Sequence, residues 1–180
     1  MKGSVFLGFE AYINDTFGME LWQNCLDATT NNHQDVYLAS ELYDDSELVS
    51  LISAASKLTN NTVSDLLREF GAHFFTTLYS LVETKLPEGL TLFEFLELVD
   101  SVIHVEVQKS DINAYTPNLF YDSPKENELL MRYSSKRNLC YFAEGLVLGA
   151  AKQFDEQVEV TQPQCIQHGD HECLLKIIKK

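Results

Sequence analysis

The hydrophobic pattern of this chain changes near Pro117, and the change limits the folds that the chain can adopt. Before it, apolar residues recur at the three- and four-residue spacing of amphipathic helices. After it come mainly short extended runs bounded by turn residues, as strands require. Helices followed by strands predict an α+β protein, with a helical N-terminal layer and then a four-stranded antiparallel sheet crossed by one helix.

The helical part is divided by clear stop signals. Gly18 separates the first two segments, Pro87-Glu88-Gly89 separates the last two, and Thr91 with Glu94 has the spacing of a capping box. A polar loop at 31–35 contains His33, which we expect to be solvated. We therefore expect helices over about 3–17, 19–29 and 44–57, then one capped by 60–62 that runs through Ser80, and one from Thr91 to about Gln108.

The remaining third is interpreted as strands around one further helix. We expect strands at 115–121, 128–133, 158–161 and 173–178, a turn at 122–127, a helix from Asn138 to about Phe154, and a closing hairpin around 168–170. No internal repeat or linker interrupts this order. The sequence thus predicts one domain over 1–180, with a helical N-terminal subdomain at 1–60 and an α/β part at 61–180.

Charge excludes some partners. The chain has 27 acidic and 13 basic residues, a formal net charge of −14, so we expect neither nucleic acid nor an acidic membrane surface as a partner. No apolar run approaches the roughly 20 residues that span a bilayer, and Glu10 comes too early for a secretory signal. We expect a soluble, cytoplasmic protein, in which the four cysteines are free, metal-bound or redox-sensing.

His104 is the histidine that stands out. On a helix over 91–108 it lies at the edge of the apolar sector, beside Asp100 and Ser101. Taken alone it is a surface histidine; the alternative is that this edge faces a cofactor, since a neutral imidazole is a common metal ligand whose tautomer a neighbouring acceptor can fix. His73 directly precedes Phe74 and Phe75 in a predicted helix, and we interpret it as a packed or partly exposed side chain.

A second feature lies downstream, in the run Tyr133-Ser134-Ser135-Lys136-Arg137. If the segment is extended, the side chains of Tyr133, Ser135 and Arg137 point to one side. Two hydroxyls and a guanidinium suit a pair of carboxylates. Arginine is scarce in this chain, with three in all, so its presence here favours a specific anion.

The Met-Lys-Gly start, His104 late in a helix, Pro117 and the Tyr-x-Ser-x-Arg run, in this order, resemble the H-NOX family. These are heme nitric oxide/oxygen binding domains, which also form the sensor region of soluble guanylate cyclase. The resemblance covers essentially the whole chain and implies a heme b between the helical layer and the sheet, bound by the part at 61–180. It makes His104 the axial ligand of the iron. Tyr133, Ser135 and Arg137 would hold the propionates, and Pro117 would press on the macrocycle.

The resemblance also indicates which gas is bound. Family members that hold oxygen place a tyrosine five residues after the arginine of the motif, and this chain has Phe142 there. Tyr141 points about 100° away on a helix and is no replacement. Bound oxygen needs a distal hydrogen-bond donor, whereas nitric oxide does not. We therefore expect a sensor of nitric oxide, with carbon monoxide as a second ligand, that excludes oxygen. The other pocket positions implied are also apolar: Val5, Phe9, Leu78 and Leu146.

The resemblance implies a signal as well. Nitric oxide would weaken or break the bond between iron and His104, the heme would relax against Pro117, and the helix would shift relative to the sheet. A separate histidine kinase or diguanylate cyclase would read that shift, and the chain would not itself be an enzyme. One rival is an enzyme with His73 or His104 as an acid/base residue, which no nucleophile, phosphate loop or converging set of residues supports.

The closing hairpin carries a separate signal. Cys165 and Cys173 flank a loop that contains two histidines, and Cys140 supplies a third thiol. Three cysteines and one histidine form a closed zinc set, and some H-NOX proteins have a similar C-terminal site that binds zinc or responds to oxidation. His168 is the expected fourth ligand and His171 the alternative; the other interpretation is a pair of reduced cysteines that oxidise to a disulfide.

This cluster defines the second rival function, a zinc- or thiol-responsive binding module that acts with or without heme. Cys25 lies in an amphipathic helix beside leucines, and we expect it to be a core residue.

Overall fold

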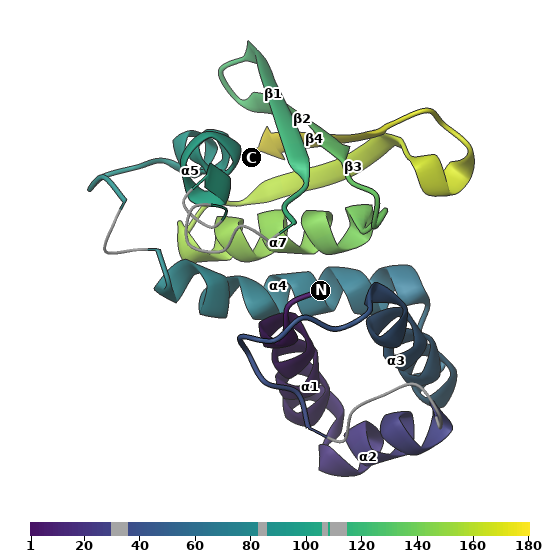
Figure 1. The fold of residues 1–180 in the computed structure, drawn as a ribbon. Coiled ribbons are helices and arrows are strands. Elements are labelled where there is room, and N and C mark those ends of the chain that lie inside the picture. Colours follow the sequence, from purple (N-terminus) through teal and green to yellow (C-terminus); the bar gives the residue numbers. More distant parts are fainter. Residues whose placement is uncertain (30–35, 83–85, 106–107, 109–114) are drawn as a thin grey trace.

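The computed structural model describes residues 1–29, 36–82, 86–105, 108 and 115–180. Within these ranges a helical layer and a four-stranded antiparallel sheet lie on either side of a pair of long helices, α4 and α7 (Figure 1). The predicted α+β fold is confirmed. The expected loop at 31–35, with His33, falls outside the described residues.

The helical layer consists of α1 (Gly3–Phe17), α2 (Met19–Ala28) and α3 (Asp45–Thr59), of which α1 and α3 pack against α4 (Val63–Ser80). Gly18, with a φ of 92°, makes the break between α1 and α2 that its position predicts. Side-chain caps start the next two helices, because Asp44 accepts from the Ser46 amide and Thr62 from the Asp65 amide. Aromatic and aliphatic side chains between these helices form a first core.

The expected helix after Thr91 begins as predicted and then changes character. Thr91 and Glu94 form the capping box at the start of α5 (Leu92–Leu98). The following segment, η2 (Val99–His104), is a π-helix, in which each turn holds more residues than in an α-helix. His104 is its last residue. The expected continuation to Gln108 crosses residues 106–107, which lie outside the described ranges.

The sheet has the order β1-β2-β4-β3, from β1 (Asn118–Lys125), β2 (Glu128–Ser134), β3 (Val158–Gln164) and β4 (Cys173–Lys179). The predicted turn at 122–127 was too long. β1 starts at Asn118 rather than Tyr115 and runs on to Lys125, so that Glu126 and Asn127 alone form the turn. The edge position of β1 and its register shift after Asp122 explain how the strand tolerates Pro124.

Helix α7 (Cys140–Gln153) lies between the sheet and α4 (Figure 1). The two helices approach at two glycines. A Cβ atom built on Gly145 would lie 2.1 Å from the carbonyl oxygen of Arg68 and 2.9 Å from the Cα of Gly71. The backbones therefore touch without an intervening side-chain layer. None of the described helices is both long and apolar enough to cross a membrane.

Candidate functional site

A cavity of about 370 Å³ opens where the helical layer meets the sheet layer. Side chains from α1, α4, α5, η2, β1, β2 and α7 line it, so segments that are far apart in the sequence together form its wall. Its walls are mainly aromatic and aliphatic. The main apolar lining residues are Val5, Leu67, Phe70, Phe74, Leu78, Val99, Ile103, Leu119, Met131, Phe142, Leu146 and Val147.

Nine of the ten cofactor-site residues expected from the sequence line this cavity: Val5, Leu78, His104, Pro117, Tyr133, Ser135, Arg137, Phe142 and Leu146. Phe9 is not among them. It is fully buried in the core of the helical layer, where its ring centroid lies 5.2 Å from that of Phe70. Phe70 itself lines the cavity, so Phe9 supports a residue of the wall rather than forming the wall.

His104 contributes an imidazole to an otherwise mainly apolar wall. Its Nδ1 lies 3.3 Å from Oδ1 of Asp100, and the same oxygen accepts a hydrogen bond from the Leu119 amide at 3.2 Å. Ser101, the other acceptor considered from sequence, instead donates to the backbone carbonyl of Glu97. Asp100 therefore links the imidazole to the first residues of β1.

The side chain of His104 is 17 % exposed. Burial lowers its pKa below the ordinary value, although the Asp100 carboxylate and the Pro117 backbone carbonyl act in the opposite direction. The ring is then neutral at pH 7. A neutral imidazole that donates Nδ1–H to a carboxylate has its lone pair on Nε2, as a metal-binding histidine requires.

The Tyr-x-Ser-x-Arg run is only partly extended, which corrects the expected geometry. Tyr133 lies in β2, but residues 136–137 form a turn, and the Arg137 amide donates to Ser135 Oγ at 3.1 Å. The turn, rather than strand alternation, is what brings the three side chains to one cavity. Burial raises the pKa of Tyr133 to about 12, so its hydroxyl stays protonated; it accepts from the Leu139 amide at 3.2 Å.

Arg137 joins the two layers of the molecule. Its Nε donates to Oδ2 of Asp45 at 2.8 Å, and a terminal nitrogen donates to the Tyr115 carbonyl at 3.1 Å. Asp45 also pairs with the N-terminal ammonium group of Met1 at 2.8 Å. Burial alone would raise the pKa of Asp45, but the two cations outweigh it and hold the pKa below its usual value.

Sequence reasoning missed three residues of this site: Asp45, Tyr115 and Tyr121. Asp45 pairs with Arg137, which is 92 positions away, and no local sequence pattern joins the two. The guanidinium carbon of Arg137 lies over the ring of Tyr115, 4.8 Å from its centroid. Tyr121 also lines the cavity, and its hydroxyl is buried with no hydrogen-bond partner in the described part of the chain. Burial, then Asp100 and Glu97, raise the pKa of Tyr121. Strand alternation with Leu119 could have indicated that Tyr121 faces inward.

Phe142 lines the cavity, as do Val5, Leu78 and Leu146, and none of these four side chains carries a hydrogen-bond donor. Its ring packs against Phe70, at 4.8 Å between centroids. The preceding residue, Tyr141, does not line the cavity, as its helical position predicts. The Tyr141 hydroxyl instead lies 3.1 Å from Nε2 of His168.

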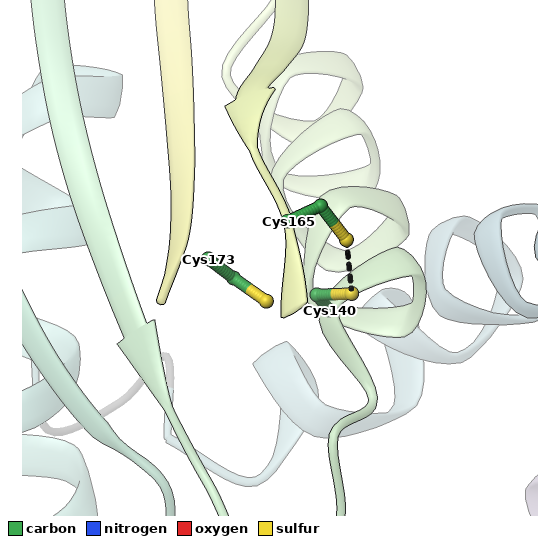
Figure 2. Close-up of side chains that lie close together, drawn as sticks. All are labelled: Cys140, Cys165 and Cys173. Carbon is green, nitrogen blue, oxygen red and sulfur yellow. Dashed lines mark hydrogen bonds between the residues drawn. The ribbon is translucent and has the colours of Figure 1, made fainter. Parts of the chain in front are cut away.

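Three thiols form a separate cluster (Figure 2), and none of the three cysteines lines the cavity. Cys140 begins α7, Cys165 follows β3 and Cys173 begins β4, and their sulfur atoms all lie within 4.8 Å of one another. The Sγ atoms of Cys140 and Cys165 are 3.5 Å apart, so both thiols are free. Burial raises the pKa of Cys140 and of Cys173, and both remain protonated.

The expected fourth ligand is not in this cluster. Among the described residues, the thiols gather without His168, which binds Tyr141, and without His171. Cys25 is a buried residue of the helical core, as expected, and burial raises its pKa to about 11.

His73, the other candidate acid/base residue, lies 3.0 Å from Asp15 between α4 and α1. It does not line the cavity. No acid/base site joining His73 and His104 is assembled in the part of the chain that the structure describes.

Comparison with known proteins agrees with this geometry. Residues 2–162 match the family model HNOB, described as haem-NO-binding. The fold is similar to a crystal structure of an H-NOX protein from S. oneidensis in the Fe(II)NO state, with 28 % identity, a TM-score of 0.90, and coverage of 100 % of this chain and 99 % of that one.

Two further solved structures are similar over the whole chain. One is the Fe(II) unliganded H-NOX protein from K. algicida, with 27 % identity, a TM-score of 0.90 and 97 % of that chain covered. The other is the Fe(II)CO form of an H-NOX domain from Shewanella oneidensis, with 29 % identity, a TM-score of 0.81 and 99 % of that chain covered. The chain therefore belongs to the haem-NO-binding (H-NOX) family, whose members are heme-based gas sensor domains.

Proposed function

We propose that this chain is a nitric oxide sensor that binds the gas at ferrous heme b, excludes oxygen, and signals through release of His104. The observation that carries the proposal is the cavity itself. It combines one neutral imidazole, a set of hydroxyls with a guanidinium, and walls that are otherwise mainly apolar. In this proposal the chain is a sensor and not an enzyme.

The residues present fit a heme. A cavity of about 370 Å³ lies in the range of cofactor pockets. When bound, heme supplies a ferrous iron that takes diatomic gases. His104 would hold the iron through Nε2, with Asp100 fixing the tautomer. Tyr133, Ser135 and Arg137 would hold the propionates, so that a propionate would share the Arg137 guanidinium with Asp45.

The cavity wall supports the choice of gas. Val5, Leu78, Phe142 and Leu146 carry no hydrogen-bond donor, and oxygen on ferrous heme depends on one far more than nitric oxide does. Nitric oxide, and carbon monoxide as a second ligand, would therefore bind without competition from oxygen.

The contacts of His104 support a route for the signal. Because Asp100 Oδ1 contacts both the imidazole and the Leu119 amide, a displacement of His104 alters the hydrogen bond to β1. Pro117, also on the cavity wall, would press on the macrocycle. The reader of the signal would be a separate histidine kinase or diguanylate cyclase. The free cysteines are in keeping with a cytoplasmic protein.

One absorption experiment tests the proposal. Ferrous protein should give a Soret band that changes when nitric oxide is added. The same protein should form no stable oxygen complex in air. Replacement of His104 by Ala should remove the axial bond and the response of the partner. A stable oxygen complex would contradict the assigned selectivity, and unaltered heme spectra in the His104→Ala variant would contradict the assigned ligand.

A second candidate function rests on the three thiols. Three buried sulfur atoms within 4.8 Å of one another are within reach of one zinc ion or can be oxidised, so the chain would act as a zinc- or thiol-responsive module with or without heme. Metal analysis of heme-free protein, combined with a count of titratable thiols, tests this function. Protein that contains no zinc and keeps four thiols after exposure to peroxide would exclude it.

A further inference from the structure

Tyr141 lies between the thiol cluster and the cavity. In the first turn of α7, Cys140 places its sulfur in the cluster and Phe142 lines the cavity. Tyr141, between them in sequence, is half-buried and packs against both the core of the helical layer and the core of the sheet layer. It is therefore in position to respond to changes in either site.

On one side, Tyr141 holds the loop of the cluster. Its hydroxyl lies 3.1 Å from Nε2 of His168, in the short 3-10 helix η3 (Ile166–His168) that follows Cys165 directly. A tyrosine hydroxyl is protonated at neutral pH, so it can hydrogen-bond with the imidazole. While it makes this contact, His168 is not among the residues whose ligand atoms gather in the cluster.

On the other side, Tyr141 touches helix α4. The guanidinium of Arg68 lies over its ring, 5.2 Å from the centroid. Arg68 Nε donates to Glu144 Oε1 of α7 at 2.7 Å, and Glu144 Oε2 accepts from Gln162 of β3 at 2.6 Å. Leu67, next to Arg68 on α4, lines the cavity. The Tyr141 ring thus covers the ion pair that joins α4 to α7.

We propose that Tyr141 couples the thiol cluster to the heme cavity. When a thiophilic divalent cation such as zinc binds the three sulfurs, His168 leaves Tyr141 to complete a tetrahedral set, and each ligating thiol gives its proton to solvent. Tyr141, without its partner, then changes its packing against Arg68, and α4 shifts at the cavity wall. Tyr141 is in this sense a positioning residue for His168. The inference rests on the proposed heme function and on the second, thiol-based one.

Coupling between two sites is reciprocal. If the cation alters the affinity of the cavity for a gas, the gas must alter the affinity of the cluster for the cation by the same factor. A coupling of about fivefold lies at the lower end of measured values and is what the rearrangement of one hydrogen bond and one ring contact justifies.

The test uses Cd²⁺, whose thiolate complexes absorb in the ultraviolet, and full-length heme-loaded protein. In the parent protein, Cd²⁺ should change the carbon monoxide dissociation rate by about fivefold. Tyr141→Phe should bind Cd²⁺ about fivefold more tightly, because no hydroxyl competes for His168, and its carbon monoxide rate should no longer respond to Cd²⁺. Cys165→Ser should bind Cd²⁺ far more weakly.

Tyr12→Phe is the matched control. The Tyr12 hydroxyl donates to Glu69 Oε2 at 2.8 Å, so this variant also removes a hydrogen bond to α4, from a tyrosine outside the cavity and the cluster. It should keep the full response to Cd²⁺. If Tyr141→Phe and Tyr12→Phe lost the response to Cd²⁺ equally, the role of Tyr141 would be overturned. Loss of any hydrogen bond to α4 would then be enough to abolish the coupling.

A readout without heme separates this inference from the proposed function. Cd²⁺ should change hydrogen exchange in α4, residues 63–80, in the parent and leave it unchanged in Tyr141→Phe, whether or not the protein holds heme. Failure of the parent to bind heme would contradict the heme function alone. Failure to bind Cd²⁺, or binding with no effect on either exchange or gas kinetics, would overturn the coupling.

Discussion

The Nδ1 atom of His104 lies 3.3 Å from Oδ1 of Asp100, four residues earlier in the same helix. That oxygen also accepts from the Leu119 amide, so one carboxylate fixes the ring and holds the start of β1. An acceptor behind a ligating histidine raises the basicity of the ring and sets its orientation. The strength of the proposed bond to iron therefore depends on Asp100.

Asp100→Asn should weaken that bond. The amide oxygen is a poorer acceptor than a carboxylate, so the iron–histidine stretching frequency of the ferrous protein, measured by resonance Raman, should fall. Ser101→Ala is the control, because the Ser101 hydroxyl binds the Glu97 carbonyl and not the imidazole. If the frequency fell in the Ser101 variant and did not change in the Asp100 variant, Asp100 would not be the residue that sets the strength of the bond.

Phe142→Tyr should introduce oxygen binding. The new hydroxyl would be the donor that the wall of Val5, Leu78 and Leu146 lacks, and one hydrogen bond to bound oxygen is expected to slow its dissociation by about tenfold. Stopped-flow mixing of ferrous protein with oxygen measures the effect. Phe142→Leu alters the size of the side chain without adding a donor, and it should remain unable to hold oxygen.

Asp45→Asn should change the dependence of stability on pH. The folded-state pKa of Asp45 is lowered, so its carboxylate stabilises the fold above the unfolded pKa of about 4, and this contribution is lost as pH falls through the lower folded value. Urea unfolding should find the variant less stable than the parent at pH 7, with the difference shrinking below about pH 4.

Asp27→Asn is the control for this pH series, because Asp27 is an exposed carboxylate that accepts from Gln23 within its own helix. The Asp45 side chain is itself 36 % exposed, so solvent screens part of the effect. A difference between parent and Asp45→Asn that stays constant from pH 7 to pH 3 would show that the charge of Asp45, paired with Arg137 and with the Met1 ammonium group, contributes nothing.

Gly145→Ala should destabilise the protein. The added methyl carbon would lie 2.1 Å from the Arg68 carbonyl oxygen and 2.9 Å from the Gly71 Cα, so α4 and α7 must separate. Overpacking of this kind costs about 1–3 kcal/mol, whereas Lys152→Ala, at an exposed site of the same helix, should change the free energy of unfolding by less than about 0.5 kcal/mol. Thermal and urea unfolding measure both.

Sequence could predict those parts of the fold that local chemistry determines. Gly18 and the Thr91–Glu94 capping box placed helix boundaries correctly, because each acts on its immediate neighbours. The π-helix that ends at His104 was missed, since hydrophobic spacing over six residues does not separate it from an α-helix. The end of β1 was missed because Pro124 is a turn signal, and only its edge position makes it acceptable in a strand.

The site residues, too, could be predicted where local sequence determines them and could not where the packing of distant elements does. The order of His104, Pro117 and the Tyr-x-Ser-x-Arg run indicated residues that the fold brings to one cavity. The pairing of Arg137 with Asp45 could not be predicted, because it depends on how two layers pack. The contact of His168 with Tyr141 could not be predicted either, because it joins a loop to a helix 27 positions away; His168 as the fourth ligand of the thiol cluster stays a prediction.

The contact between Gly71 and Gly145 sets a limit on how this cavity can be remodelled. No amino acid is smaller than glycine, so substitution at either position can only push α4 and α7 apart, never bring them closer. Natural variation or protein engineering can therefore make the cavity smaller only through the side chains that line it near this contact, such as Phe74 and Phe142. The distance between α4 and α7 at the two glycines would stay as it is.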